Sequence, residues 1–168
     1  MMGLFAREEE MRPIVAAWMA EQGLTVRGQT IIWHLCDMMG CEFDPAMVGR
    51  RVRREKPWQP LHKRIIAVEL KLSRIVEALH QAYNNLCAVD ESYVAFPAEV
   101  AARIVARPAR WEKYWAHGIG VLGVNEKCEV AIPAGHNLDA VQAKVEKQVE
   151  KFWRDWRRSE RAKGDEDR

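Results

Sequence analysis

The chain has 168 residues, of which 48% are hydrophobic and 30% charged, and its formal net charge is +2. These values fit one globular domain with a single core and argue against a largely disordered chain. The longest apolar run, Ile14–Ala20, is much shorter than the roughly 20 residues that a transmembrane helix needs. No basic segment followed by an apolar one opens the chain, so no secretory signal is expected. The sequence therefore predicts a cytoplasmic protein with no membrane partner.

The four cysteines form no CxxC pair. Zinc sites usually gather their ligands at short spacing, and the histidines do not show such spacing either. We therefore expect reduced thiols and no structural zinc site.

Hydrophobic spacing predicts the elements of the first half of the chain. A helix is expected over residues 7–23, with an apolar side formed by Met11, Ile14, Val15 and Trp18. Residues 24–43 predict two strands, the second of which alternates along Ile31, Trp33, Leu35 and Asp37. A polar connection with three prolines follows at residues 44–64, and then comes an apolar strand at 64–73.

The second half alternates helices with strands. Helices at 73–87 and 98–106 flank a short strand at 92–97, and two strands within 118–134 are joined by a turn. A last helix starts near Leu138, with an apolar stripe made of Val141, Val145, Val149, Phe152 and Trp156. This order predicts an α/β fold with a central mixed β-sheet flanked by helices. We expect one domain over residues 1–160 and a charged, disordered tail at 161–168.

The strand at 64–73 carries two charged residues within an apolar run. Alternation puts Ile66, Val68 and Leu70 on one face and Glu69 and Lys71 on the other. Buried charges are costly unless they are paired or bound to a metal. One interpretation is a Glu–Lys pair at the exposed rim of a half-covered sheet. The other is a functional site.

Asp37 favours the functional interpretation. If its strand neighbours the strand at 64–73, Asp37 and Glu69 can converge on one divalent cation, with the carbonyl of Leu70 as a further ligand. The cation would polarise a phosphoryl oxygen and lower the pKa of a bound water. Lys71 could then orient that water and offset the charge that develops on the phosphate.

An Asp followed by Glu-x-Lys on an apolar strand and then by a helix resembles the PD-(D/E)xK nuclease superfamily. The resemblance covers the leading helix, "CDMMG", "AVELKLS", "IVEALHQAYNN" and "SYVAFP". It implies a restriction-endonuclease-like fold and a Mg (or Mn) cofactor. The metal ligands that it implies are Asp37 and Glu69, with Glu8 as an assisting acid, and the catalytic residues are Asp37, Glu69, Lys71 and Gln81.

The basic connection predicts contact with DNA. Its cationic and aromatic side chains can displace counterions from phosphates and stack on a base; these residues are Arg50, Arg51, Arg53, Arg54, Lys56 and Trp58. A solvated basic loop is the alternative. The aromatic residues of "FWRDWRR" in the last helix are interpreted first as core or homodimer contacts, because an apolar stripe at helical spacing usually packs.

Two functions remain open, and a structural subunit that pairs through the Trp-rich last helix is a third, less favoured one. One is a metal-dependent nuclease acting on DNA. The other is a catalytically inactive DNA-binding or assembly protein that retains the nuclease fold. Asp37, Glu69 and Lys71 favour the first, whereas Gly28 and Gln29 favour the second because they stand where related sequences carry an acid.

Overall fold

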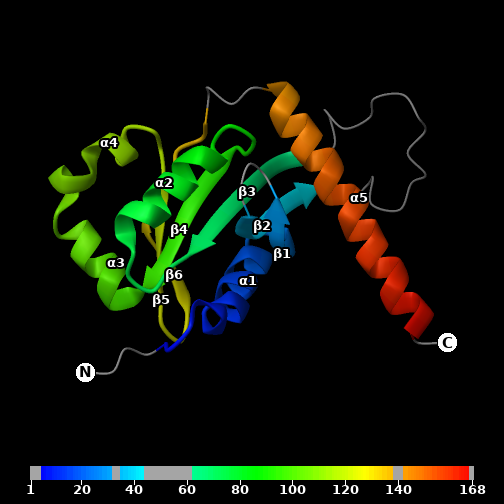
Figure 1. The fold of residues 1–168 in the computed structure, drawn as a ribbon, viewed down its shortest axis with the longest axis horizontal. Helices are drawn as coiled ribbons and strands as arrows, with labels where there is room; N and C mark the ends of the chain where they lie inside the picture. Colours follow the sequence, from blue (N-terminus) through cyan, green and yellow to red (C-terminus); the bar gives the residue numbers. More distant parts are fainter. Residues whose placement is uncertain (1–4, 32–34, 44–61, 138–141, 167–168) are drawn as a thin grey trace.

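The computed structural model describes residues 5–31, 35–43, 62–137 and 142–166 (Figure 1). In chain order, its elements are η1 Glu8–Glu10, α1 Arg12–Glu21, β1 Thr25–Ile31, β2 Leu35–Phe43, β3 His62–Leu70, α2 Ile75–Asn85, β4 Glu91–Pro97, α3 Ala98–Val105, η2 Pro108–Trp111, α4 Glu112–Trp115, β5 Gly120–Val124, β6 Cys128–Ile132 and α5 Gln142–Glu166. None of the described helices is both long and apolar enough to cross a membrane.

The described strands form one six-stranded sheet in the order β1-β2-β3-β4-β5-β6. β1, β2 and β3 pair antiparallel, β3, β4 and β5 pair parallel, and β6 returns antiparallel to β5. Parallel neighbours need a crossover segment, and α2 and α3 lie in the two crossovers. The predicted α/β fold with a central mixed sheet flanked by helices is confirmed.

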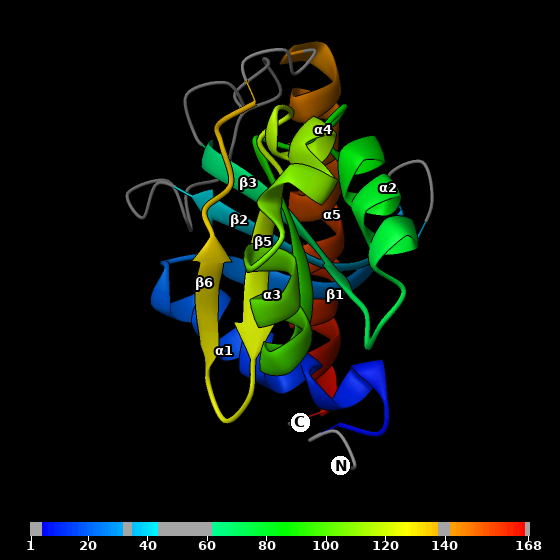
Figure 2. The same ribbon diagram turned by 90° about the vertical axis from the view of Figure 1, so that its left-hand side faces the viewer.

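Helices cover both faces of the sheet. The apolar side of α1, with Met11, Val15 and Met19, packs against Val68 and other residues of one face. α2 and α3 cover the parallel strands on the other face, where Figure 2 shows them in front of the sheet.

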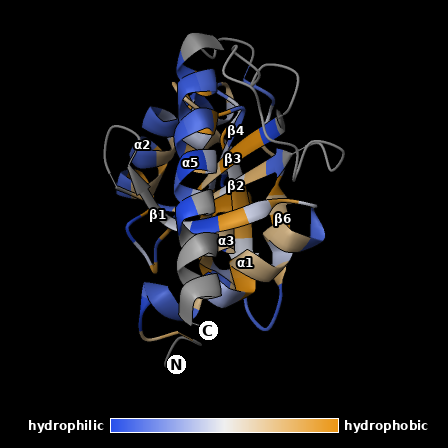
Figure 3. Ribbon diagram, turned by 90° about the vertical axis from the view of Figure 1, so that its right-hand side faces the viewer, coloured by the Kyte–Doolittle hydropathy of each residue, from blue (hydrophilic) through white to orange (hydrophobic). Residues whose placement is uncertain are grey.

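α5 packs on the antiparallel strands. Val145, Val149 and Phe152 are buried among residues of β2 and β3, and Trp156 packs against their edge. Figure 3 shows α5 crossing these strands with a largely hydrophilic outer side. The described part of the predicted stripe is therefore core of this chain, whereas Val141 and the expected start near Leu138 lie outside the described residues. α5 continues to Glu166, past the residue at which the charged tail was expected to begin. A homodimer through this helix stays a prediction.

The prediction that Ile31, Leu35 and Asp37 lie on one strand is wrong, and Trp33 is outside the described residues. Ile31 ends β1, Leu35 begins β2, and these two residues pair with each other across a hairpin. Apolar alternation continued through the connection, so a period of two gave no sign of the turn. Asp37 consequently lies near the start of β2, and the chain stays in the sheet up to Phe43.

Candidate active site

Glu69 and Lys71 are buried at the end of β3. Glu69 is 1% exposed and Lys71 8%. Ile66, Val68 and Leu70 enter the core beneath α1, as the alternation predicted. The interpretation of Glu69 and Lys71 as a pair at an exposed rim is wrong, because α1, α2 and α5 cover both faces of the sheet here. Two charged groups therefore lie inside the protein, where they need specific partners.

Asp37 reaches this point from the neighbouring strand. Met38 pairs with Val68, so antiparallel register puts Asp37 across from Glu69. The Asp37 Oδ2 accepts a hydrogen bond from the backbone N–H of Leu70 at 2.9 Å and lies 3.8 Å from Lys71 Nζ. The two motif strands thus bring Asp37 and Lys71 together, and Glu69 stands next to Leu70 on the strand that Asp37 contacts.

Glu8 joins the cluster from the segment before α1. Its Oε2 lies 3.9 Å from Lys71 Nζ. The short helix η1 leads directly into Met11, which is fully buried under the sheet and ties this segment to the core. Of the three consecutive acids at the amino terminus, Glu8 is therefore the one that contacts Lys71.

Asn85 is the partner of Glu69 that the sequence analysis missed. It ends α2, is fully buried, and donates from Nδ2 to Glu69 Oε1 at 2.7 Å. The Cys36 thiol lies nearby, 3.9 Å from the same nitrogen. Burial, and then the negative charge of Glu69, raise the pKa of Cys36 well above that of an ordinary thiol. An Asn on the buried side of a helix could have signalled this role.

Gln81 lies on α2 one turn before Asn85. It lines a shallow depression with Arg74, Glu77 and His80. Its side-chain oxygen is buried and accepts no hydrogen bond from the described residues. Asn85 occupies the position that contacts Glu69, so the catalytic role of Gln81 stays a prediction.

The carboxylates of this cluster are of the chemical type that binds a hard cation. Carboxylates of Asp37 and Glu8 both approach one positive group, the Lys71 ammonium. Carboxylate oxygens are also the ligands that magnesium prefers. Within the described part of the chain, however, no group of three His, Cys, Asp or Glu side chains stands ready to hold a metal ion.

The predicted DNA contacts cannot be placed in the fold. Arg50, Arg51, Arg53, Arg54, Lys56 and Trp58 all lie outside the described residues. Arg64, at the end of the same basic run, belongs to β3. Its guanidinium lies 3.5 Å from Glu42 and 3.6 Å from Glu91, so we assign it to the sheet and not to a phosphate.

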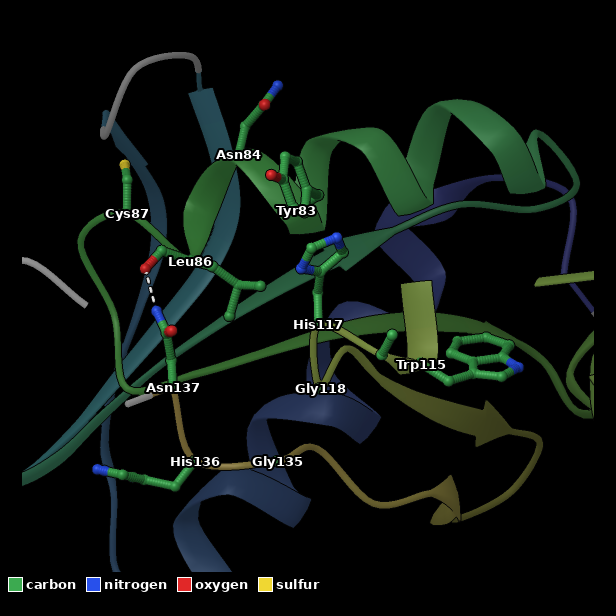
Figure 4. Close-up of a pocket in the computed structure, with 11 residues that line it drawn as sticks. Tyr83, Asn84, Leu86, Cys87, Trp115, His117, Gly118, Gly135, His136 and Asn137 are labelled. Atoms are coloured by element: carbon green, nitrogen blue, oxygen red, sulfur yellow. Dashed lines mark hydrogen bonds between the residues drawn. The ribbon is translucent and has the colours of Figure 1, made fainter. Parts of the chain in front are cut away.

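A separate pocket opens on the other side of α2, between this helix, the end of α4 and the segment after β6 (Figure 4). The rings of Tyr83 and His117 meet there with their centroids 4.7 Å apart. Figure 4 shows Cys87, His117 and His136 pointing in different directions, so these side chains do not form a metal site. Tyr83 and Asn85 face opposite sides of the helix, which separates the pocket from Glu69.

Comparison with known proteins supports the fold of the chain and does not bear on its function. No protein-family model matches the chain, and neither does any curated protein. The SPO1766 protein of unknown function from Silicibacter pomeroyi is a similar solved structure, with a TM-score of 0.63 and 19% sequence identity. The match covers 94% of this chain and 90% of that one. The chain shares its architecture with that protein over nearly its whole length.

Proposed function

We propose that the protein is a magnesium- or manganese-dependent nuclease of the PD-(D/E)xK type that hydrolyses phosphodiester bonds in DNA. The observation that carries this proposal is the approach of Asp37, in β2, to Lys71, which directly follows β3: the Asp37 Oδ2 lies 3.8 Å from Lys71 Nζ. The register of β2 and β3 also puts Glu69 across from Asp37.

Asp37 and Glu69 would hold the metal, with Glu8 assisting. Such a cation supplies Lewis-acid stabilisation of the phosphate and a bound water of lowered pKa. Lys71 contributes a positive charge that is mostly shielded from water, where its attraction for a phosphate oxygen is stronger than at the surface. The end of a rigid sheet keeps these groups in a fixed geometry.

The order of elements also supports the proposal. α1, three antiparallel strands, α2 and the parallel strand β4 follow one another as the resemblance implies. The carboxyl ends of parallel strands are favoured places for ligands in open α/β sheets, and Lys71 directly follows β3.

The test is cleavage of plasmid and linear DNA by the full chain with Mg²⁺ or Mn²⁺. We expect nicking or cutting by the wild type and none by Lys71→Ala, whose fold is checked by circular dichroism. Lys113→Ala is a matched control, because Lys113 lies on α4 outside the site and contacts Tyr114. Equal cleavage by the wild type and Lys71→Ala would rule out the role of Lys71.

A second candidate is a DNA-binding protein that has kept the fold without the reaction. Two observations favour it: no group of three metal-ligating side chains stands among the described residues, and Asn85 occupies one oxygen of Glu69. Salt-dependent DNA binding with no cleavage under either metal would select this candidate.

A further inference from the structure

Arg12 holds the backbone of Asp37. Arg12 is the first residue of α1, and its Nη1 donates to the Asp37 carbonyl at 2.8 Å across 25 residues of chain. Hydrogen bonds from a charged donor are shorter and stronger than those from neutral groups. α1, through Arg12, therefore fixes the peptide group of Asp37 in β2.

Gly28 makes room for this contact. It lies in β1 opposite Met38, and a Cβ added there would be 2.8 Å from Arg12 Nη1. That separation is closer than real Cβ atoms approach, so the guanidinium, which is the flexible end of its side chain, would have to shift from its place beside the Asp37 carbonyl. The backbone of Gly28 is outside the left-handed region, so the reason for glycine here is space and not conformation.

Asp37 lies where the pairing of β2 with β3 ends, although β1 pairs with β2 on both sides of it. The ladder between β2 and β3 begins with Met38 and Val68. Beyond this pair, the Leu70 N–H bonds to the carboxylate of Asp37 instead of a strand carbonyl. The Asp37 carbonyl and carboxylate are thus held from two sides, by Arg12 and by Leu70.

We propose that Arg12 is a positioning residue for Asp37 and that Gly28 is present to admit its guanidinium. The consequence for catalysis rests on the proposed function, whereas the coupling between the two residues does not. Arg12 also occupies the space beside Gly28 where the resemblance leads one to expect an acid.

The experiment compares Arg12→Ala, Arg12→Lys, Gly28→Ala and the double variant Arg12→Ala/Gly28→Ala in the full chain. Gly123→Ala is the matched control, since its Cβ would meet Ala101 at an ordinary 3.4 Å. Three quantities are measured for each protein: the free energy of unfolding in urea, Mn²⁺ affinity by calorimetry, and kcat and KM for DNA cleavage.

We expect Arg12→Ala to lower kcat roughly 10- to 100-fold, as misplaced catalytic groups do, with KM for DNA little changed and Mn²⁺ bound more weakly. Gly28→Ala should show the same losses to a smaller extent, because the flexible guanidinium of Arg12 is displaced but not removed, and Arg12→Lys should recover part of the losses of Arg12→Ala. The double variant should be no worse than the more damaged single variant, because both changes remove one contact. Gly123→Ala should behave as the wild type.

The inference would be overturned if Gly28→Ala had the Mn²⁺ affinity and the kcat of the wild type. It would also be overturned if the losses of unfolding energy in the two single variants added fully in the double variant. If the wild type neither binds Mn²⁺ nor cuts DNA, the proposed function is lost. Non-additive unfolding energies would then still support the coupling of Arg12 with Gly28, and additive ones would refute it.

Discussion

At the scale of single residues, the candidate site contains two buried charged groups, Glu69 and Lys71, and each has a partner. Glu69 accepts from Asn85, Lys71 lies between Asp37 and Glu8, and the Asp37 carbonyl accepts from Arg12. Without such partners, ionised side chains would destabilise the fold by several kcal/mol each, on the order of the whole stability of a domain. The pairing explains how a core sheet tolerates "VELK".

Asn85 offers a direct check of this pairing. Asn85→Ala removes the donor to a buried carboxylate, so we expect the free energy of unfolding to fall by about 1–3 kcal/mol at pH 7. Asn85→Asp keeps the shape but faces one carboxylate with another, so its loss should be larger at pH 7 and smaller at pH 5, where a proton can be shared. Urea unfolding at both pH values measures this. Equal stability of Asn85→Ala and the wild type would contradict the role of Asn85.

Buried thiols predict a loss of stability at alkaline pH. Burial, together with the charges of Asp90 and Glu42, raises the pKa of Cys41 above the 9.0 of an ordinary thiol. In the unfolded chain the thiol loses its proton near pH 9, whereas in the folded chain it keeps it. The contribution of each buried thiol to the free energy of unfolding is therefore constant below about pH 9. Above that pH it falls by at most about 1.4 kcal/mol per pH unit.

The measurement is urea unfolding at pH 8, 9 and 10 for the wild type and Cys41→Ala. Cys36, whose pKa is also raised, adds to the slope in both proteins. The variant should lose less stability between pH 9 and pH 10 than the wild type. Identical slopes would show that Cys41 ionises equally in both states.

At the scale of elements, α1 positions the site because it packs closely on the sheet. Gly40 of β2 lies beneath it, and an added Cβ would be 3.1 Å from Leu24 Cβ and 2.7 Å from Met19 Cε. Met19 can move its flexible end, but Leu24 Cβ is close to the backbone.

We expect Gly40→Ala to destabilise the protein by about 1–3 kcal/mol through this overpacking. Gly123→Ala is the control, and it should change stability by less than the Gly40 variant because its Cβ meets only ordinary contacts. The melting temperatures of the two variants measure the difference. If both variants melt together with the wild type, α1 does not pack as tightly as described.

Strong local patterns made most elements predictable from the sequence. The apolar run of β3 and the amphipathic pattern of α2 predicted their types and order, whereas the pairing of the strands was seen only in the structure. The hairpin between Ile31 and Leu35 was missed because its flanks keep the same alternation.

Part of the candidate site could also be predicted from the sequence, because Asp37, Glu69 and Lys71 are charged residues in apolar segments. Asn85 and Arg12 were not found, since each acts on a residue at least 16 positions away. Such contacts depend on the packing of helices on the sheet, so an Asn on the buried side of a helix is a sign of a buried partner but does not say which residue it contacts. The glycine at position 28 became interpretable only once Arg12 was located beside it.

At the scale of the whole molecule, α5 completes the core over the antiparallel strands. Phe152 is fully buried there with Val145 and Val149. Phe152→Ala should therefore lower the free energy of unfolding by about 3–5 kcal/mol, with the molar mass from light scattering unchanged. A variant of normal stability but lower molar mass would show that the stripe is an interface between two copies.

The central claim is that Asp37 and Glu69 hold a divalent cation beside Lys71. The most direct measurement is anomalous scattering from crystals of the full chain soaked with Mn²⁺, collected for the wild type and for Asp37→Asn. We expect a manganese peak between the carboxylates of Asp37 and Glu69 in the wild type and the loss of this peak in the variant. A wild-type crystal with no peak there, or an equal peak in Asp37→Asn, would contradict it.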